Sequence, residues 1–432
     1  MSALTVIEPA PQPADPLTAR LDDLILDLGG YVSDSSPAQD GVRIDRIARL
    51  EKLRAATAAL QAAETVRFAR SQVAEQLAQD VHPDAIGRGI GDQIALACKI
   101  SPSAGSHRLA VARALWFELP ETFTQLTAGE LSEQVAESVV RETRHLDAPT
   151  RLAVDAQIAA AGITTLGPRA AAACARRLAY EADPQRYLER GRTERKHRRV
   201  GIRPAPDTMA ILRGYLPVEQ GVACYASLRK HTDSLIAGGD PRTRDQIMAD
   251  TLVERLTGQA QAEDVNIEVN LTMPLSSLTD PGDRSAATIP GYGPLPGPVA
   301  RHIVQTSQGR RWWRRLFTRP SHLSPDGMII GGDPARRRFD GWLAQLISLR
   351  DQTCRDPFCD APIRHHDHIV RFADGGPTTL ANGRGVCARG NYVREMPGWQ
   401  IILNHDGSRR HPHTITVITP TGHRYRSRAP DP

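Results

Sequence analysis

Apolar residues recur at three- to four-residue spacing over most of the first half of the chain, which is the period of an amphipathic α-helix. The longest such pattern covers residues 44–79, and shorter ones follow as far as residue 181 with breaks of only a few residues. Two more are found over residues 218–237 and 242–258. The pattern therefore predicts a mainly helical region with short connections.

Three segments have the character of β-strands instead. Residues 190–203 end in a strand-like run, residues 208–216 form its candidate partner, and residues 265–273 (VNIEVNLTM) alternate apolar and polar side chains. Residues 274–298 are rich in Gly and Pro and predict a loop or linker. A short helix over 299–305, strands near 316 and over 328–330, and a helix over 334–350 are expected to follow.

These patterns predict an α+β protein with a mainly helical N-terminal domain, a small sheet and a separate C-terminal module. We expect residues 1–40 to be a disordered or weakly ordered tail and residues 41–273 to be the mainly helical domain. Residues 274–333 form a Gly/Pro-rich and basic linker region, and residues 334–432 form the C-terminal domain, which ends in a β-hairpin.

The composition is that of a soluble protein, with 24% charged and 40% hydrophobic residues, but the charge is unevenly placed. Residues 301–432 contain 21 Arg, no Lys and 11 acidic residues, a net charge of +10 within a total of +5. Such a basic region suits a phosphate-backbone partner. No window offers the ~20 apolar residues of a membrane span, and residues 1–16 do not have the pattern of a secretory signal. We therefore expect a cytoplasmic protein without a membrane partner.

Residues 349–399 contain several polar side chains that could take part in catalysis or bind a metal ion. Asp367 and His368 end a predicted strand, a Gly-Gly loop leads to Asn382, and Asn391 lies nine residues further in a predicted short helix. Phosphodiester hydrolysis needs a deprotonated water and a divalent cation at the phosphate. This ordered set of residue types matches the ββα-metal, or HNH, nuclease pattern.

Each residue of the set has an expected role. His368 suits a general base, because histidine exchanges a proton near neutral pH. Asp367 points to the other face of the strand and offers a hard oxygen to Mg²⁺ or Mn²⁺. Asn391 would add a second oxygen to the metal, and Asn382 would fix the orientation of the base by a hydrogen bond.

Cysteines predict a second, structural metal site. Cys354, Cys359 and Cys387 fall within 34 residues beside a group of histidines, and in a cytosolic chain such grouping favours metal over a disulfide. Tetrahedral Zn²⁺ needs a fourth ligand, which Cys-x₂-Cys spacing places at Gly390. Either a water or a histidine such as His365 completes the site, or zinc is bound weakly or not at all.

The motifs of this region support a resemblance to a known family. They are TCR-x₃-CDAPIRH-x-DH, GGPT, N-x₄-C and NY-x₂-E-x-PGW, followed by the C-terminal TPTGHRYRSRAP. On these motifs residues 349–432 resemble the HNH endonuclease module of actinobacterial 13E12 repeat family proteins. The N-terminal region, with DPRTRDQIMADTLVERLTG over 240–258, resembles that family's helical domain of unknown function.

The resemblance implies a ββα-metal (HNH) module that hydrolyses DNA phosphodiester bonds with Mg²⁺ or Mn²⁺ and holds a structural Zn²⁺. Two positions depart from the family pattern. Gly390 stands where the family has Cys, and Arg384 stands where it has an apolar residue. The expected function is therefore a metal-dependent HNH endonuclease, with a catalytically degenerate nucleic-acid-binding protein of mobile-element origin as the alternative.

Guanidinium groups in the C-terminal third are candidate DNA contacts. They are Arg311, Arg314 and Arg315, which flank two tryptophans, and Arg336, Arg337 and Arg338, which open the helix expected over 334–350. Such groups can grip phosphates while the indoles stack. The alternative is that the tryptophans anchor the chain and the arginines are solvated. We expect DNA as the partner, and self-association through the helical domain stays open.

Overall fold

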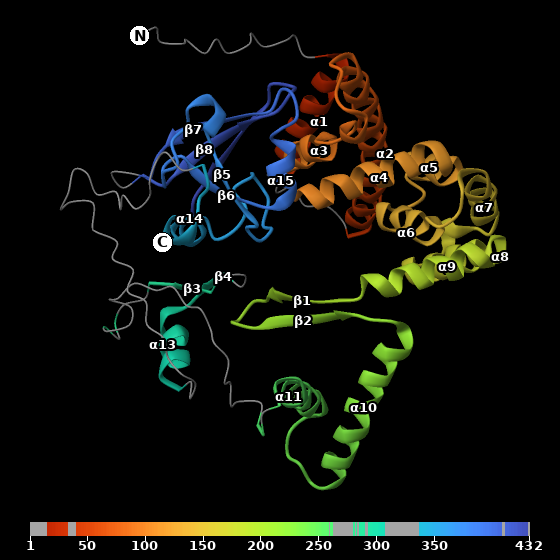
Figure 1. Cartoon of the computed structure of the whole chain (residues 1–432). Helices are drawn as coiled ribbons and strands as arrows, with labels where there is room; N and C mark the ends of the chain where they lie inside the picture. Colours follow the sequence, from red (N-terminus) through yellow and green to blue (C-terminus); the bar gives the residue numbers. More distant parts are fainter. Residues whose placement is uncertain are drawn as a thin grey trace.

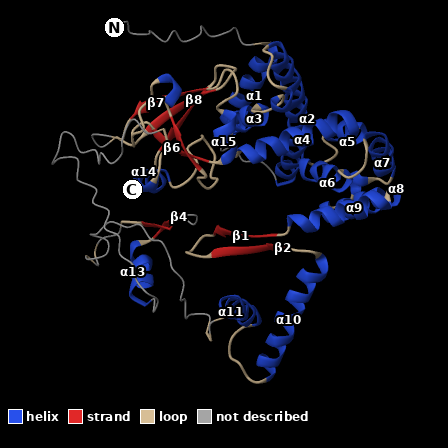
Figure 2. Cartoon of the chain, viewed as in Figure 1, coloured by secondary structure: helices blue, strands red, loops and turns tan. Residues whose placement is uncertain are grey.

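The structure is a computed structural model of the chain. It describes residues 15–32, 40–258, 260–261, 280, 282, 285–289, 293–306, 337–407 and 411–430. The protein is α+β, with helices in the N-terminal half and small antiparallel sheets towards the C-terminus (Figures 1 and 2).

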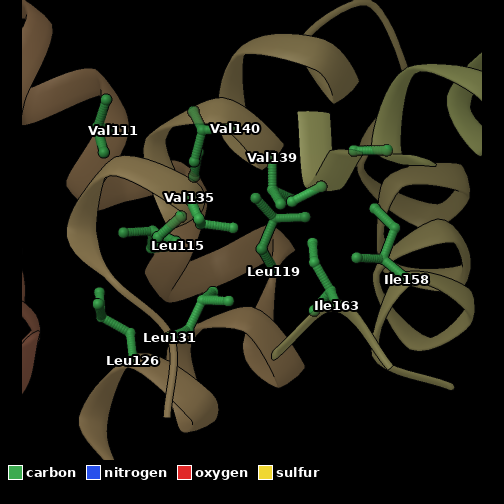
Figure 3. Packing of buried hydrophobic residues seen from close by; sticks show 14 of the residues in the cluster. Val111, Leu115, Leu119, Leu126, Leu131, Val135, Val139, Val140, Ile158 and Ile163 are labelled. Carbon is green, nitrogen blue, oxygen red and sulfur yellow. The ribbon is translucent and has the colours of Figure 1, made fainter. Parts of the chain in front are cut away.

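Seven helices form the body of the N-terminal domain, close to the positions that the apolar spacing predicts. They are α2 (Asp40–Ala78), α3 (Ile90–Cys98), α4 (Pro102–Glu118), α5 (Pro120–Thr127), α6 (Glu133–Thr143), α7 (Ala148–Ala160) and α8 (Pro168–Ala182). The apolar faces of all of these helices except α3 meet in one core, in which Leu119, Val139 and Ile158 are fully buried (Figure 3). Ile90 and Ile94 of α3 pack with Ala69 of α2 in a second cluster. Burial of such side chains stabilises the domain by about 1.5–3 kcal/mol each.

Side-chain caps set several of the helix starts. Ser101, Ser132 and Asp147 each accept a hydrogen bond from a backbone N–H in the first turn of α4, α6 and α7. The start of α5 is capped from another helix, because the buried carboxylate of Asp155 in α7 accepts hydrogen bonds from the backbone N–H groups of Glu121 and Thr122. This bond ties α5 to α7.

The N-terminal segment corrects one expectation. Residues 1–40 were expected to be a weakly ordered tail, but they contain the helix α1 (Pro16–Val32). Leucines at positions 17, 21, 24 and 28 give this segment a helical period, and only Leu24 among them is even half-buried. The apolar spacing therefore accounts for the helix α1, although little of the surface of α1 is buried.

The chain leaves the helical core through α9 (Pro184–Glu194) and then forms a two-stranded ribbon of β1 (Arg199–Pro204) and β2 (Ala210–Tyr215). The basic run that was expected to lead into a strand is thus helical in its first part, capped by Asp183. Both strands are exposed on both faces. The helices α10 (Val218–Ala237) and α11 (Arg244–Thr257) follow, away from the core (Figure 1).

The predicted linker at 274–333 also needs correction. It contains the helix expected over 299–305, as α13 (Gly297–Thr306), together with two strands that were not expected, β3 (Ala287–Ile289) and β4 (Gly293–Leu295). These elements share a small core of Ala287, Leu295 and Ala300. Gly and Pro here form the turns of a small folded unit. The expected strands over 265–273, near 316 and over 328–330 lie outside the described residues.

The C-terminal domain starts with α14 (Gly341–Asp351), later than the expected helix over 334–350. The strands β5 (His365–His368) and β6 (Gly383–Val386) form an antiparallel pair, which the short helix α15 (Ala388–Val393) follows directly. The domain ends in a three-stranded sheet of β7 (Gln400–His405), β8 (Thr414–Ile418) and β9 (Arg424–Arg428), not in the expected hairpin. The third strand, RYRSR, is short and Arg-rich, so its apolar signal is weak.

The C-terminal domain docks on the helical domain through α15 and α3 (Figure 1). Arg389 in α15 makes a two-point ion pair with Asp92 in α3, at 2.7 and 2.6 Å. Thr421 donates a hydrogen bond to Gln93. A Cβ on Gly89 would lie 3.1 Å from Nε1 of Trp399, so the two surfaces are closely apposed.

Candidate functional site

The strand β5 carries the candidate chemistry and lies between two helices. Side chains of a strand alternate between its faces, so His366 and His368 share one face and His365 and Asp367 share the other. On the first face, His366 Nε2 lies 2.8 Å from Oγ of Ser348 in α14. On the second face, Asp367 bonds to Arg394, the residue that ends α15. The expectation that Asp367 and His368 point to opposite faces agrees with these contacts.

Asp367 is held by two guanidinium groups. Arg384 Nη2 donates to Asp367 Oδ2 at 3.2 Å, and Arg394 Nη1 donates to the same oxygen at 2.5 Å. Oδ1 of Asp367 accepts no hydrogen bond from the described residues. The carboxylate therefore keeps one oxygen available for a cation, while its other oxygen is shared by two positive groups.

Arg384 is fully buried and lies between two carboxylates, Asp356 at 2.7 Å and Asp367 at 3.2 Å. Burial by itself lowers the pKa of Arg384, but the charges of the two carboxylates outweigh burial and raise the pKa. A buried guanidinium without such partners would be strongly unfavourable. The buried guanidinium of Arg384 is thus accommodated by the surrounding acids.

His368 is enclosed. Its Nε2 lies 2.9 Å from Oγ1 of Thr378, its ring centroid lies 4.4 Å from that of Phe339 and 5.7 Å from that of Phe372, and 8% of the residue is exposed. Burial, together with the positive charges of Arg394 and Arg337, lowers the pKa of His368 below its ordinary value of 6.5. His368 is consequently neutral at pH 7, which is the form that accepts a proton.

Asn382 fixes the loop that joins β5 to β6. Its Oδ1 accepts from the Val370 N–H at 2.8 Å, and its Nδ2 donates to the carbonyls of Val370 and Pro377 at 3.0 and 2.9 Å. Gly376 allows this closure, because a Cβ there would lie 1.9 Å from the Val370 carbonyl oxygen. In the described part of the chain Asn382 makes no hydrogen bond to the His368 ring, and its side chain bonds instead to the backbone that follows His368.

Asn391 lies in α15, which packs against β5 and β6. It is half-buried, and its backbone N–H bonds to the Cys387 carbonyl at 3.1 Å. Its side chain makes no hydrogen bond to the described part of the chain. The structure therefore places Asp367 on the strand face that bonds to α15, and the His368 ring on the opposite face against Phe339.

The three cysteines of the predicted zinc site come together. The Sγ atoms of Cys354, Cys359 and Cys387 lie within 4.8 Å of one another, and all three residues are buried. Hydrogen bonds from the thiols of Cys354 and Cys359, and one from the Gly390 N–H, lower the pKa of Cys387. This buried cluster could hold a metal ion, and its donor atoms suit zinc.

Two of the six candidate arginines lie in the described part of the chain. Arg337 and Arg338 are exposed just before α14, and the charge of Arg337 acts on His368. Arg311, Arg314, Arg315 and Arg336 lie outside the described residues.

Sequence reasoning missed the polar groups around the site. Arg394, Thr378 and Asp356 contact the candidate residues, and none of them was singled out. Arg394 lies seven residues after Cys387, which corresponds to two turns of a helix. This spacing along the predicted short helix is the one sequence signal that points to Arg394. Thr378 follows the GGP turn and gives no signal of its own.

Comparison with known proteins gives one family match and one relative. A family model described as a domain of unknown function, DUF222, matches residues 47–305, from α2 to α13, and so includes the unit that was expected to be a linker. The uncharacterized protein Rv3776 of Mycobacterium tuberculosis is 27% identical over 143 residues, 32% of this chain and 24% of that protein. The chain thus spans about a quarter of the length of that relative. No solved structure matches the chain.

Among the helices that the structure describes, none combines the length and the apolarity needed to cross a membrane.

Proposed function

We propose that this chain, which belongs to the family of proteins with the DUF222 domain of unknown function, is a metal-dependent HNH-type endonuclease that hydrolyses DNA phosphodiester bonds. The helical domain would place or assemble the C-terminal domain, which would carry the chemistry. DNA is the proposed partner, and a cytoplasmic location and self-association stay predictions.

The observation that carries the proposal is the free oxygen of Asp367, which precedes His368 on the strand β5 and lies on the opposite face from the His368 ring. β5, β6 and α15 follow one another as two strands and a helix, which is the order of a ββα-metal module. Asp367 lies on the strand face that bonds to this helix, with Oδ1 free of hydrogen bonds from the described residues. A carboxylate oxygen with an amide oxygen, offered by Asn391, fits a hard divalent cation.

The proposed roles follow from the contacts. A bound Mg²⁺ or Mn²⁺ would stabilise charge on the phosphate and the leaving oxygen. Asp367 and Asn391 would hold this ion, and Arg384 and Arg394 would keep Asp367 ionised and oriented. His368 would take the proton of the attacking water, since its lowered pKa keeps the imidazole neutral at pH 7. Asn382 is a positioning residue.

The cluster of Cys354, Cys359 and Cys387 is proposed to hold a structural Zn²⁺. It joins the loop before β5 to the start of α15, since Cys387 is the N-cap residue of that helix. A metal here would fix the helix against the strands that carry Asp367 and His368.

The charge distribution supports a nucleic-acid partner. The C-terminal 132 residues carry the net +10. Arg337 and Arg338 are exposed, and the charge of Arg337 acts on His368. The proposal includes the other four candidates, Arg311, Arg314, Arg315 and Arg336, because they lie in the same basic region of the sequence.

One specific observation favours the second candidate, a catalytically degenerate nucleic-acid-binding protein of mobile-element origin. His368 is 8% exposed behind Phe339, and Asp367 already has two cationic partners. If water cannot reach His368, and if the charge of Asp367 is already neutralised, the protein would bind DNA without cleaving it.

Two measurements on the full chain distinguish these functions. The first is nicking of supercoiled plasmid in Mg²⁺ or Mn²⁺, with a chelator as control. The second is binding to fluorescent duplex DNA across a salt series. An endonuclease gives chelator-sensitive nicking and salt-dependent binding. The second candidate gives binding alone, and a folded chain that does neither contradicts both.

A further inference from the structure

The side chain of Asp356 lies against Gly390, the position at which Cys-x₂-Cys spacing places a fourth ligand. A Cβ built on Gly390 would lie 1.8 Å from Oδ2 of Asp356, 3.0 Å from its Cγ and 3.6 Å from its Oδ1. The Asp356 carboxylate thus occupies the space into which a side chain at position 390 would project. The separation of 1.8 Å is comparable to the length of a carbon–sulfur bond, so the oxygen is as far from that Cβ as a cysteine sulfur would be.

Position 390 adjoins the cluster. The Gly390 N–H donates to Cys387 Sγ at 3.3 Å, within the first turn of α15. Asp356 lies in the loop between Cys354 and Cys359, and its backbone carbonyl accepts from the Cys359 N–H at 3.1 Å. Its charge acts on the Cys354 thiol. The carboxylate is therefore built into the loop that supplies two of the three sulfurs.

From this arrangement we infer that Asp356 is the fourth ligand of a Cys₃Asp zinc site formed with Cys354, Cys359 and Cys387. Zinc in proteins accepts carboxylate oxygen as well as cysteine sulfur, and its structural sites are tetrahedral. Asp356 replaces the cysteine that position 390 lacks, and Gly390 is the residue that makes room for it. The inference concerns the zinc site alone, so it stands or fails independently of DNA cleavage.

The two oxygens of Asp356 have different partners. Oδ1 accepts from Arg384 Nη1 at 2.7 Å, whereas Oδ2, which faces Gly390, accepts no hydrogen bond from the described residues. Asp356 does not belong to the set of groups that all lie within 4.8 Å of one another, which contains the three sulfurs. Ligation therefore requires Oδ2 to turn towards the sulfurs, while Oδ1 can keep its bond to Arg384.

The neighbouring cations suit such a site. Three thiolates and one carboxylate leave an excess of negative charge on Zn²⁺. Arg384 and Arg389 lie close enough for the charges of the cluster's sulfurs to act on them. Arg384 is fully buried, so its charge is poorly screened by water. The two departures from the family pattern are therefore connected through Asp356: Gly390 makes room for its carboxylate, and Arg384 binds that carboxylate.

The test measures zinc affinity of the full chain by competition with a chelating dye, and ligand type by the absorption spectrum of the Co²⁺-substituted protein. Asp356→Asn keeps the shape of the side chain but removes its charge. We expect it to weaken Zn²⁺ binding at least as much as the roughly 10- to 100-fold losses caused by removing an outer-shell partner. Asp360→Asn removes an exposed carboxylate beside Cys359, and it should leave the affinity unchanged.

A second control separates ligation from ion pairing. Arg384→Gln removes the cationic partner of the Asp356–Arg384 ion pair and leaves the Asp356 carboxylate free to bind metal. Arg384 is an outer-shell partner of the ligand, so the inference expects Arg384→Gln to weaken Zn²⁺ binding by no more than roughly 10- to 100-fold, and clearly less than Asp356→Asn does. Equal losses in Asp356→Asn and Arg384→Gln would overturn the inference, because Asp356 would then serve only to neutralise Arg384. Unchanged affinity in Asp356→Asn would overturn it as well.

The double variant Asp356→Ala with Gly390→Cys covers the case in which Asp356→Asn does not fold. It moves the fourth ligand from position 356 to position 390 and removes the clash that Gly390→Cys alone would create. We expect this chain to fold, to bind one Zn²⁺, and to increase the thiolate-to-Co²⁺ charge-transfer band in proportion to four sulfurs instead of three. A double variant that neither folds nor binds zinc would contradict a ligand role for Asp356.

Discussion

Asp92 in α3 and Arg389 in α15 form a two-point ion pair across the domain boundary, although 297 positions separate them in the chain. The Asp92 side chain is 9% exposed and that of Arg389 is 36% exposed. Burial raises the pKa of Asp92, and the hydrogen bonds and charge of Arg389 oppose this effect. The pair links the family's helical domain to the helix that carries Asn391.

We predict that this pair couples the stability of the two domains. Asp92→Asn and Arg389→Gln should each lower the free energy of unfolding by about 2 kcal/mol, the scale of charge-assisted hydrogen bonds. A double-mutant cycle should then give a coupling energy of at least about 1 kcal/mol. The exposed pair Arg177–Glu181 is the control, with an expected coupling below about 0.5 kcal/mol. Coupling that does not exceed that of the control would show that the domains are independent.

Asn382 should be required for the stability of the loop between β5 and β6. Asn382→Ala leaves one N–H and two carbonyls without their partner at a position that is 4% exposed, and should cost roughly 3 kcal/mol in urea unfolding. Asn404→Ala removes one hydrogen bond, from the Thr416 hydroxyl to an exposed asparagine, and should cost about 1 kcal/mol. Similar losses in both variants would argue against a positioning role for Asn382.

His413 should make the C-terminal domain sensitive to acid. Its Nε2 donates to the Ala381 carbonyl at 2.9 Å, and burial of the ring lowers its pKa from 6.5 to about 4. Between these values the unfolded chain binds a proton that the folded chain does not, so stability falls as pH falls from 6.5 to 4. The loss amounts to about 3 kcal/mol.

The measurement is urea unfolding of the wild type and of His413→Gln at pH 7, 5.5 and 4. Glutamine keeps a donor but does not titrate in this range. The difference in pH dependence between the two chains should equal the His413 contribution. Parallel curves would show that His413 takes up its proton equally in the folded and unfolded states.

Arg337 and Arg338 should contribute to DNA affinity through phosphate contacts. Replacing both by Ala should weaken binding and reduce the slope of log affinity against log salt by about 1.8, since each phosphate contact contributes ~0.9. Arg169→Ala, which removes an exposed arginine of α8, should leave the slope unchanged. Fluorescence anisotropy of a labelled duplex measures both. An unchanged slope in the double variant would place the DNA elsewhere.

The sequence predicts the helical domain well because its helices bury apolar faces at regular spacing. Leu119, Val139 and Ile158 fall on such faces and form one core. The α+β class was predicted, whereas the three-stranded sheet was not, because RYRSR carries almost no apolar signal. The helix over 299–305 was predicted, whereas β3 and β4 were not, because Gly and Pro dominate the composition of the segment that holds them.

The candidate site was predicted in its residues but not in its contacts. The sequence indicated the cysteine cluster, whose three sulfurs meet, and the opposite orientation of Asp367 and His368 on one strand. It did not indicate that Arg384 and Arg394 share one oxygen of Asp367, or that Asp356 fills the space beside Gly390. These contacts join residues from different loops and helices, and spacing along a chain carries no information about them.

The initial rate of supercoiled-plasmid nicking in Mg²⁺ or Mn²⁺ tests the proposed nuclease most directly, measured for three chains. His368→Ala removes the proposed base, and His366→Ala removes a histidine on the same strand face whose pKa is also lowered by burial. Wild type and His366→Ala should nick at similar rates, and His368→Ala should be slower by about 10² or more. Equal nicking by His368→Ala, or no metal-dependent nicking by the folded wild type, would contradict the account.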